Sequence, residues 1–168
     1  MPRRRGVRLV AALAVATPVA VATAAPASAP PFTVFAKAGP ARTSSTAVLE
    51  RVRVGPHPGF DRVVFEFRGE TPAWSAGYLP RVIQDPTGRP LPLAGRAFLR
   101  VIFHGVRFDR PAASAPLVRR PRFATLLEVK EAGDFEAVAS FGLGLRKRAG
   151  FRGLHLSRPG RIAIDVSH

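Results

Sequence analysis

The chain has 168 residues, of which 26 are lysine or arginine, 11 are aspartate or glutamate and none is cysteine, so its formal net charge is +15. This length suits one domain with a tail and is too short for a barrel enzyme of about 250 residues. The lack of cysteine excludes a disulfide scaffold, a cysteine-ligated zinc or iron–sulfur site, a thiol nucleophile and a lipid-modified N-terminal cysteine.

The first 27 residues have the order of a secretory signal peptide. Four arginines precede an apolar run over residues 9–16, and a cluster of small residues follows it. We expect cleavage after Ala27, within the window 24–29. Because the run is alanine-rich and is followed by Pro18, no stable membrane span is expected after removal of this segment. The sequence therefore predicts a secreted, extracytoplasmic chain that remains strongly basic.

Residues 28–47 are predicted to be a flexible linker, because prolines, a glycine and a Thr-Ser-Ser-Thr run leave no sustained period. Phe32, Val34 and Phe35 are the exception. These side chains can dock on the domain or belong to a short strand. The folded domain is expected to span residues 48–168.

From residue 48 onward the hydrophobic period is close to two, which predicts an all-β domain. In residues 48–54, Glu50 is expected on the face of Val52, and residues 60–67 form a half-buried strand. The two strands are predicted to form a hairpin around a five-residue loop. Further strands are predicted at residues 78–84, 97–103, 124–130, 135–145, 151–156 and 161–166.

Turn-forming residues separate these strands, among them a predicted turn at residues 132–134. The 17 prolines and 15 glycines favour many short strands over helices, so we expect a β-sandwich. Residues 123–127 are the best place for a short helical turn, in competition with a strand. Residues 104–122 are long for a hairpin connection; such loops are often functional, and mobile spacers are as common.

Few residues have the spacing of catalytic or metal-binding motifs. The four histidines lack the spacing of a zinc site, so neither a metal nor another cofactor is expected. Ser140 lacks the first glycine of a nucleophile elbow and is predicted to be structural. Gly142 and Gly144 more simply mark a bulge or close packing than a dinucleotide site.

Acidic residues gather around the predicted turn at residues 132–134. Glu131, Asp134 and Glu136 lie there, with Glu128 just upstream. Two carboxylates at the right separation can cleave a glycosidic bond, so a small hydrolase is a lower-ranked alternative to a solvated turn. Asp165 is expected to pair with an arginine on a neighbouring strand.

Basic residues form two clusters in predicted loops. Guanidinium groups suit carboxylates and phosphates, so we expect these residues to bind an anionic polymer. The alternative is an ordinary solubilising surface in an arginine-rich composition. Nucleic acid is not expected as a partner, because the clusters have no recognised motif and no interleaved aromatic residues. The candidate binding residues are Arg107, Arg110, Arg119, Arg120, Arg122, Arg146, Lys147, Arg148 and Arg152.

The C-terminal pattern resembles the closing hairpin of the AMIN domain family. An apolar strand is followed by a turn with Pro159, then by Arg161, alternating aliphatic residues and Asp165. Residues 60–67, 133–136 and 140–144 are also similar to segments of AMIN-like domains of secreted actinobacterial proteins. The resemblance implies a β-sandwich of two small sheets that carries no catalytic residue.

The same resemblance implies a role at the cell envelope, where AMIN domains target proteins by binding peptidoglycan. This chain departs from that pattern because it has no second, enzymatic domain and carries an insert-like loop at residues 104–122. We therefore expect a non-enzymatic module for peptidoglycan or another anionic wall polymer. The alternative is a module that binds an envelope or secretion protein through an exposed strand edge or the tail at residues 32–35.

Overall fold

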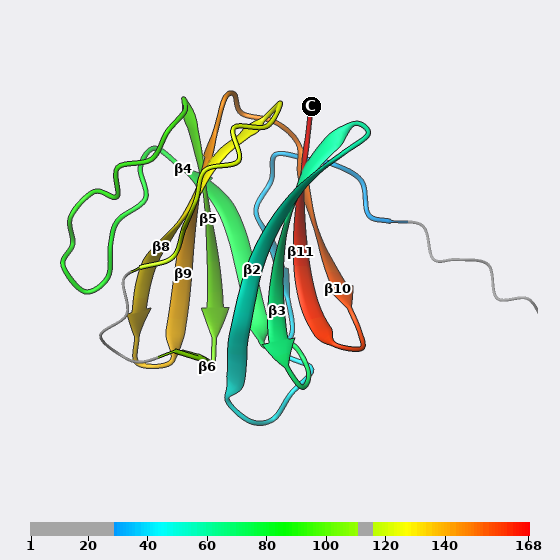
Figure 1. The fold of residues 1–168 in the computed structure, drawn as a ribbon, viewed down its shortest axis with the longest axis vertical. Helices are drawn as coiled ribbons and strands as arrows, with labels where there is room; N and C mark the ends of the chain where they lie inside the picture. Colours follow the sequence, from blue (N-terminus) through cyan, green and yellow to red (C-terminus); the bar gives the residue numbers. More distant parts are fainter. Residues whose placement is uncertain (1–28, 111–115) are drawn as a thin grey trace, which may run out of the picture.

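The computed structural model describes residues 29–110 and 116–168. The regular structure in this part is all β-strand, and two sheets face each other across a shared core (Figure 1). The prediction of an all-β sandwich of two sheets is confirmed. The predicted signal peptide lies outside the described residues. Among those residues, no helix is long and apolar enough to cross a membrane.

Each sheet mixes strands from distant parts of the chain. One sheet has five strands, in the order β10 (Phe151–Leu156), β11 (Gly160–Ser167), β3 (Phe60–Arg68), β2 (Ala47–His57) and β6 (Val106–Phe108). The other has six, in the order β1 (Lys37–Gly39), β4 (Ala73–Leu79), β5 (Ala97–His104), β9 (Val138–Leu145), β8 (Leu126–Phe135) and β7 (Val118–Arg119). The pairing of β2 with β6 is parallel, and the other strand pairs are antiparallel.

Alternating side chains from both sheets fill the core. Val63, Phe65 and Phe67 of β3 are fully buried, as their period-two spacing predicts. The ring centroid of Phe65 lies 4.8 Å from that of Phe103 on β5 and 4.9 Å from that of Phe141 on β9. These aromatic contacts join the two sheets at the centre of the molecule.

The first hairpin differs from the prediction in two ways. A β-bulge lies between Leu49 and Arg51, so Leu49 is buried and Glu50 is exposed. The expected face for Glu50 is therefore wrong, because a bulge adds a residue and changes which side chains point inward. The strand also continues through His57, which leaves a tight turn at Pro58 and Gly59 instead of a five-residue loop.

Two other strand boundaries differ from the prediction. The strand expected at residues 78–84 is β4, which ends at Leu79, and residues 80–96 form a long loop before β5. The turn expected at residues 132–134 is wrong, because these residues belong to β8. The pairing of β8 with β9 shifts register there, between Glu131 and Gly133. The chain reverses at Glu136 and Ala137, whose φ angles of 49° and 59° are left-handed.

Residues 32–39 lie against the domain instead of forming part of a flexible linker. β1 pairs with β4, and the backbone of Thr33 forms a bridge with Phe151. The centroid of the Phe32 ring lies 4.3 Å from the guanidinium carbon of Arg152. The tail thus covers one side of the sandwich, and docking holds for Phe32 and Val34, which are partly buried, but not for Phe35, which is exposed.

Candidate anion-binding surface

Several arginines on the sheets are neutralised by buried carboxylates. Asp165 on β11 is fully buried and accepts hydrogen bonds from Arg62 Nε at 2.6 Å and Arg152 Nε at 2.9 Å. The expected pairing of Asp165 with an arginine on a neighbouring strand is confirmed. The hydrogen bond of Arg62 to Asp165 and the charge of that carboxylate raise the pKa of Arg62 against the opposing effect of burial. Arg152 is therefore engaged within the fold.

Two arginines of the long connection at residues 104–122 are engaged in the same way. Arg110 pairs with Glu131, whose carboxylate also accepts the backbone N–H of Leu117 at 3.0 Å. Arg120 donates to Glu128 at 2.9 Å. Both acids are buried, so these pairs fix the connection against β8.

The acids around β8 are arranged as structural groups. Burial raises the pKa of Glu128, but the N–H of Ala94 and the ammonium of Lys130 outweigh it and hold the pKa below its usual range. Burial, and then the charge of Glu131, raise the pKa of Asp134. Glu136 is exposed in the hairpin turn. Since Glu128 is kept ionised and its oxygens are occupied, it is poorly suited to donate a proton to a leaving group.

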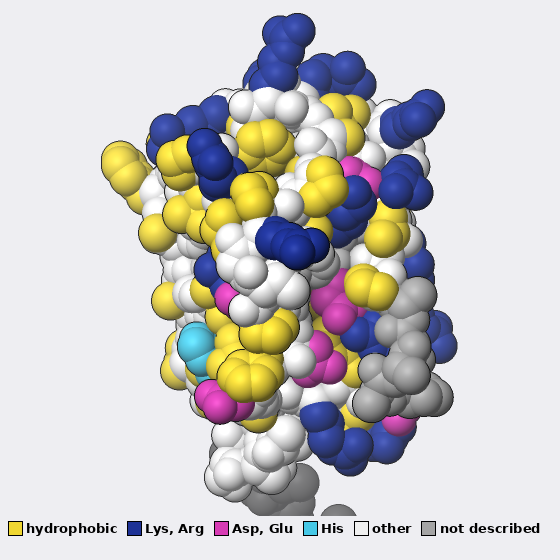
Figure 2. All heavy atoms as spheres, turned by 90° about the vertical axis from the view of Figure 1, so that its left-hand side faces the viewer, with side chains coloured by type: hydrophobic (Ala, Val, Ile, Leu, Met, Phe, Trp, Pro, Cys, Tyr) yellow, Lys and Arg dark blue, Asp and Glu magenta, His cyan; other side chains and the backbone are white. Residues whose placement is uncertain are grey.

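A second group of cations lies at one end of the sandwich, and we call it the basic end. All its members are exposed, and none forms an ion pair with an acid among the residues that the structure describes. Lys and Arg side chains gather at the upper end of the molecule in Figure 2. The basic end consists of Arg96, Arg122, Arg146, Lys147 and Arg148.

Backbone hydrogen bonds bring three separate segments together at the basic end. The N–H of Arg146 donates to the carbonyl of Thr125 at 2.9 Å, and the N–H of Arg96 donates to the carbonyl of Leu145 at 2.8 Å. The N–H of Thr125 in turn donates to the buried carboxylate of Asp61 at 2.7 Å. The basic end therefore sits where β3 begins and β9 ends.

The remaining two candidates lie elsewhere. Arg107 is on β6, which pairs with the first residues of β2 at the opposite end of the sandwich. Arg119 is on the short edge strand β7. Both side chains are exposed. The predicted cluster in residues 104–122 is thus dispersed in space, and of its members only Arg122 joins the cluster at residues 146–148.

Arg96 was missed by the sequence analysis. At the basic end, Arg122 lies 26 residues away along the chain and the cluster at residues 146–148 lies about 50 residues away, so no local pattern marks Arg96. The sequence signal nearest to it is the pair Gly142 and Gly144, for which a bulge or close packing is predicted. The structure confirms that packing, since a Cβ on Gly142 would contact Leu93 and one on Gly144 would collide with the carbonyl of Ala94.

In residues 29–110 and 116–168, no group of three or more histidine, aspartate or glutamate side chains comes together as a metal site. Comparisons with curated protein sequences and with solved structures found no match. The family model of the AMIN-like domain matches residues 47–168, from the first residue of β2 through β11. The resemblance seen in the C-terminal hairpin is confirmed, and the chain belongs to the AMIN-like domain family.

Proposed function

We propose that this chain is a secreted, non-enzymatic module that binds an anionic polymer of the cell envelope, with peptidoglycan as the preferred ligand. The observation that carries this proposal is the separation of its charges. Acids neutralise arginines on the sheets and in the long connection, whereas the basic end has no acidic partner among the described residues.

Exposed cations that have no acidic ion-pair partner attract anionic polymers and raise their local concentration. The stem-peptide carboxylates of peptidoglycan are suitable partners, because an arginine can bind a carboxylate through two parallel hydrogen bonds. Family membership supports a role at the envelope. The buried carboxylates of Glu128 and Glu131 accept backbone N–H groups within the fold, which supports a binding role over a catalytic one.

Sedimentation with purified cell wall tests this proposal. The chain is expected to sediment with the wall at low salt, and the Arg146→Gln/Lys147→Gln variant is expected to lose most of that binding. The matched control is Arg42→Gln/Arg107→Gln, which removes the same charge from exposed residues at the opposite end of the sandwich. Failure of the unaltered chain to sediment at low salt, or equal losses in both variants, would refute the proposal.

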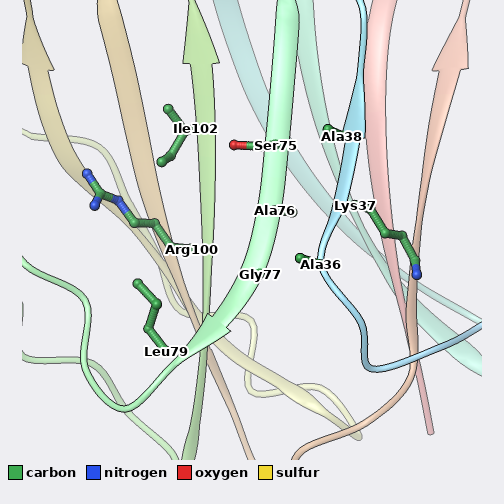
Figure 3. Close-up of a pocket in the computed structure, with 9 residues that line it drawn as sticks. All are labelled: Ala36, Lys37, Ala38, Ser75, Ala76, Gly77, Leu79, Arg100 and Ile102. Carbon is green, nitrogen blue, oxygen red and sulfur yellow. The ribbon is translucent and has the colours of Figure 1, made fainter.

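A specific observation favours a second function, the binding of an envelope protein. Phe35 is 75% exposed and Leu79 is 40% exposed. Beside them, a groove of about 470 Å³ runs along the outer face of the six-stranded sheet (Figure 3). Its lining includes Leu79 and Ile102, with Ala36 and Ala38 from the docked tail. Exposed apolar groups around a groove are typical of protein-binding surfaces.

The variant Phe35→Ser separates the two functions. If the groove binds a protein, this variant loses cross-linking to envelope proteins in the producing cell and keeps its sedimentation with purified wall. If wall binding is lost as well, the tail belongs to the polymer site and the second function is unsupported. Phe35 is exposed, so the substitution is expected to leave the stability of the fold nearly unchanged.

A further inference from the structure

A pocket of about 280 Å³ opens beside the basic end, between the end of β4 and the start of β5. Two arginines and several apolar side chains line it. The groove beside Phe35 is also lined by cations, but its Arg100 forms an ion pair with Asp85, whereas neither arginine of this pocket has an acidic partner among the described residues. The residues that matter here are Tyr78, Leu79, Pro80, Arg96, Phe98 and Arg148.

The fold holds Arg148 in place through Tyr78. The guanidinium carbon of Arg148 lies 5.1 Å from the centroid of the Tyr78 ring. The Tyr78 hydroxyl donates a hydrogen bond to the carbonyl of Ala149 at 2.6 Å and accepts one from the N–H of Ala149 at 3.1 Å. Both the side chain of Arg148 and the next residue in the chain are therefore fixed against β4.

Glycines hold Arg96 in place from the other side. Gly95 has a φ of 112°, and a Cβ at this position would collide with the backbone of Leu145. Because Gly95 has no side chain, the backbone of the 80–96 loop packs directly against the backbone at the end of β9. There the N–H of Arg96 donates a hydrogen bond to the carbonyl of Leu145. Two cations without acidic partners among the described residues are presented to one pocket from a rigid backbone.

We propose that this pocket binds the free carboxylate end of a short peptide that carries small apolar side chains. The two guanidinium groups can neutralise and orient a carboxylate. Leu79, Pro80 and Phe98 supply apolar surface for a methyl-sized side chain next to it. The volume is slightly below that of pockets for drug-sized ligands, which suits a dipeptide end. A phosphodiester chain would leave the apolar lining unused.

This inference rests on the proposed function in one respect, because peptidoglycan stem peptides offer such ends. It is nevertheless tested without the wall. Amide NMR signals of the chain are followed during titration with N-acetyl-alanyl-alanine, as the L,L and the D,D isomers. Saturable shifts are expected at Tyr78, Phe98 and Ala149. The same dipeptide with a C-terminal amide is the control and is expected to bind about ten-fold more weakly or not at all.

The variant Arg96→Gln/Arg148→Gln is expected to weaken dipeptide binding about ten-fold or more, whereas Arg42→Gln/Arg107→Gln leaves it unchanged. Equal binding of the carboxylate and amide forms would overturn the proposal. The proposal would also be overturned if inorganic phosphate produced the same shifts and displaced the dipeptide, since the pocket would then be a phosphate site.

The wall experiment and the dipeptide experiment can fail separately. Dipeptide binding by a chain that does not sediment with the wall would support the pocket and refute the proposed function. Sedimentation with the wall by a chain that shows no dipeptide shifts would refute the pocket and leave the basic end as the polymer-binding surface.

Discussion

Asp165 shows how single buried acids hold this sandwich together. Its carboxylate binds Arg62 from β3 and Arg152 from β10, and these two strands flank β11. Both arginine side chains are themselves largely buried. Removing the negative charge leaves two cations without compensation in a region of low dielectric constant.

We therefore expect Asp165→Asn to lower the free energy of unfolding by about 3 kcal/mol. Glu66→Gln is the control, because its partners Arg51 and Arg53 are exposed, and it is expected to cost at most about 1 kcal/mol. Urea denaturation of both variants measures the difference. An equal loss of the free energy of unfolding in both variants would show that the buried Asp165 ion pairs stabilise the fold no more than the exposed pairs of Glu66 do.

His155 links both sheets through a small hydrogen-bonded network. Its Nε2 accepts the indole N–H of Trp74 at 2.9 Å, and its Nδ1 lies 2.9 Å from the hydroxyl of Thr71. Burial, and then the charge of Arg42, lower the pKa of His155 below its ordinary value. The neutral ring is therefore the form that fits the folded chain.

This lowered pKa predicts a pH dependence of stability. As the pH falls below about 6.5, the unfolded chain binds this proton before the folded chain does, so stability decreases until the folded-state pKa is passed. His155→Gln is expected to be less stable at pH 7 but to show a shallower loss between pH 7 and 5. The fluorescence of Trp74, the only tryptophan, follows unfolding next to the network. If the free energy of unfolding falls equally with pH in both chains, this role of His155 is contradicted.

At the scale of elements, the position of the 80–96 loop depends on direct packing against the backbone of β9 at a glycine, which has no side chain. A Cβ on Gly144 would collide with the carbonyl of Ala94, whereas a Cβ on Gly55 of β2 would meet nothing within 4 Å. The loop carries Arg96 and one wall of the pocket. A glycine at residue 144 of β9 is thus needed to place Arg96 at the basic end as well as to form the fold.

Gly144→Ala is expected to destabilise the fold by about 2 kcal/mol and to weaken dipeptide binding, because the loop must move away from β9. Gly55→Ala is expected to change stability by less than about 1 kcal/mol. Thermal unfolding and the NMR titration check both expectations. An unchanged melting temperature for Gly144→Ala would show that the loop shifts at little cost.

The strands that the sequence predicted best have strong alternation and clear turns. β3, β10 and β11 lie within a residue or two of their expected bounds. β1 and β7 have only three and two residues, which is too short to show a period. The bulge in β2 and the continuation of β8 past Gly133 depend on the partner strand, so local pattern could not locate them.

The candidate site could be predicted only where its residues are neighbours in sequence. The cluster at residues 146–148 was predicted in this way. The engagement of Arg110 and Arg120 by buried acids, and the approach of Arg96 to Arg148, depend on how distant segments pack. Charge counting therefore overestimated the cations that are free to bind a ligand.

At the scale of the whole molecule, charge is distributed unevenly. Ion pairs neutralise much of the two sheets, and the basic end keeps its positive charge (Figure 2). Attraction between exposed charges weakens as salt shortens the screening length to about 8 Å at physiological ionic strength. Binding through the basic end must therefore depend on salt.

The affinity for purified peptidoglycan, measured over a series of salt concentrations, tests the central claim most directly. The unaltered chain is expected to bind steeply more weakly as salt rises from about 20 mM to about 500 mM, where the screening length falls to a few ångströms. Arg146→Gln/Lys147→Gln is expected to bind more weakly and with a shallower salt dependence, while Arg42→Gln/Arg107→Gln keeps the original slope. A salt-independent affinity, or an unchanged slope in the basic-end variant, would contradict the account.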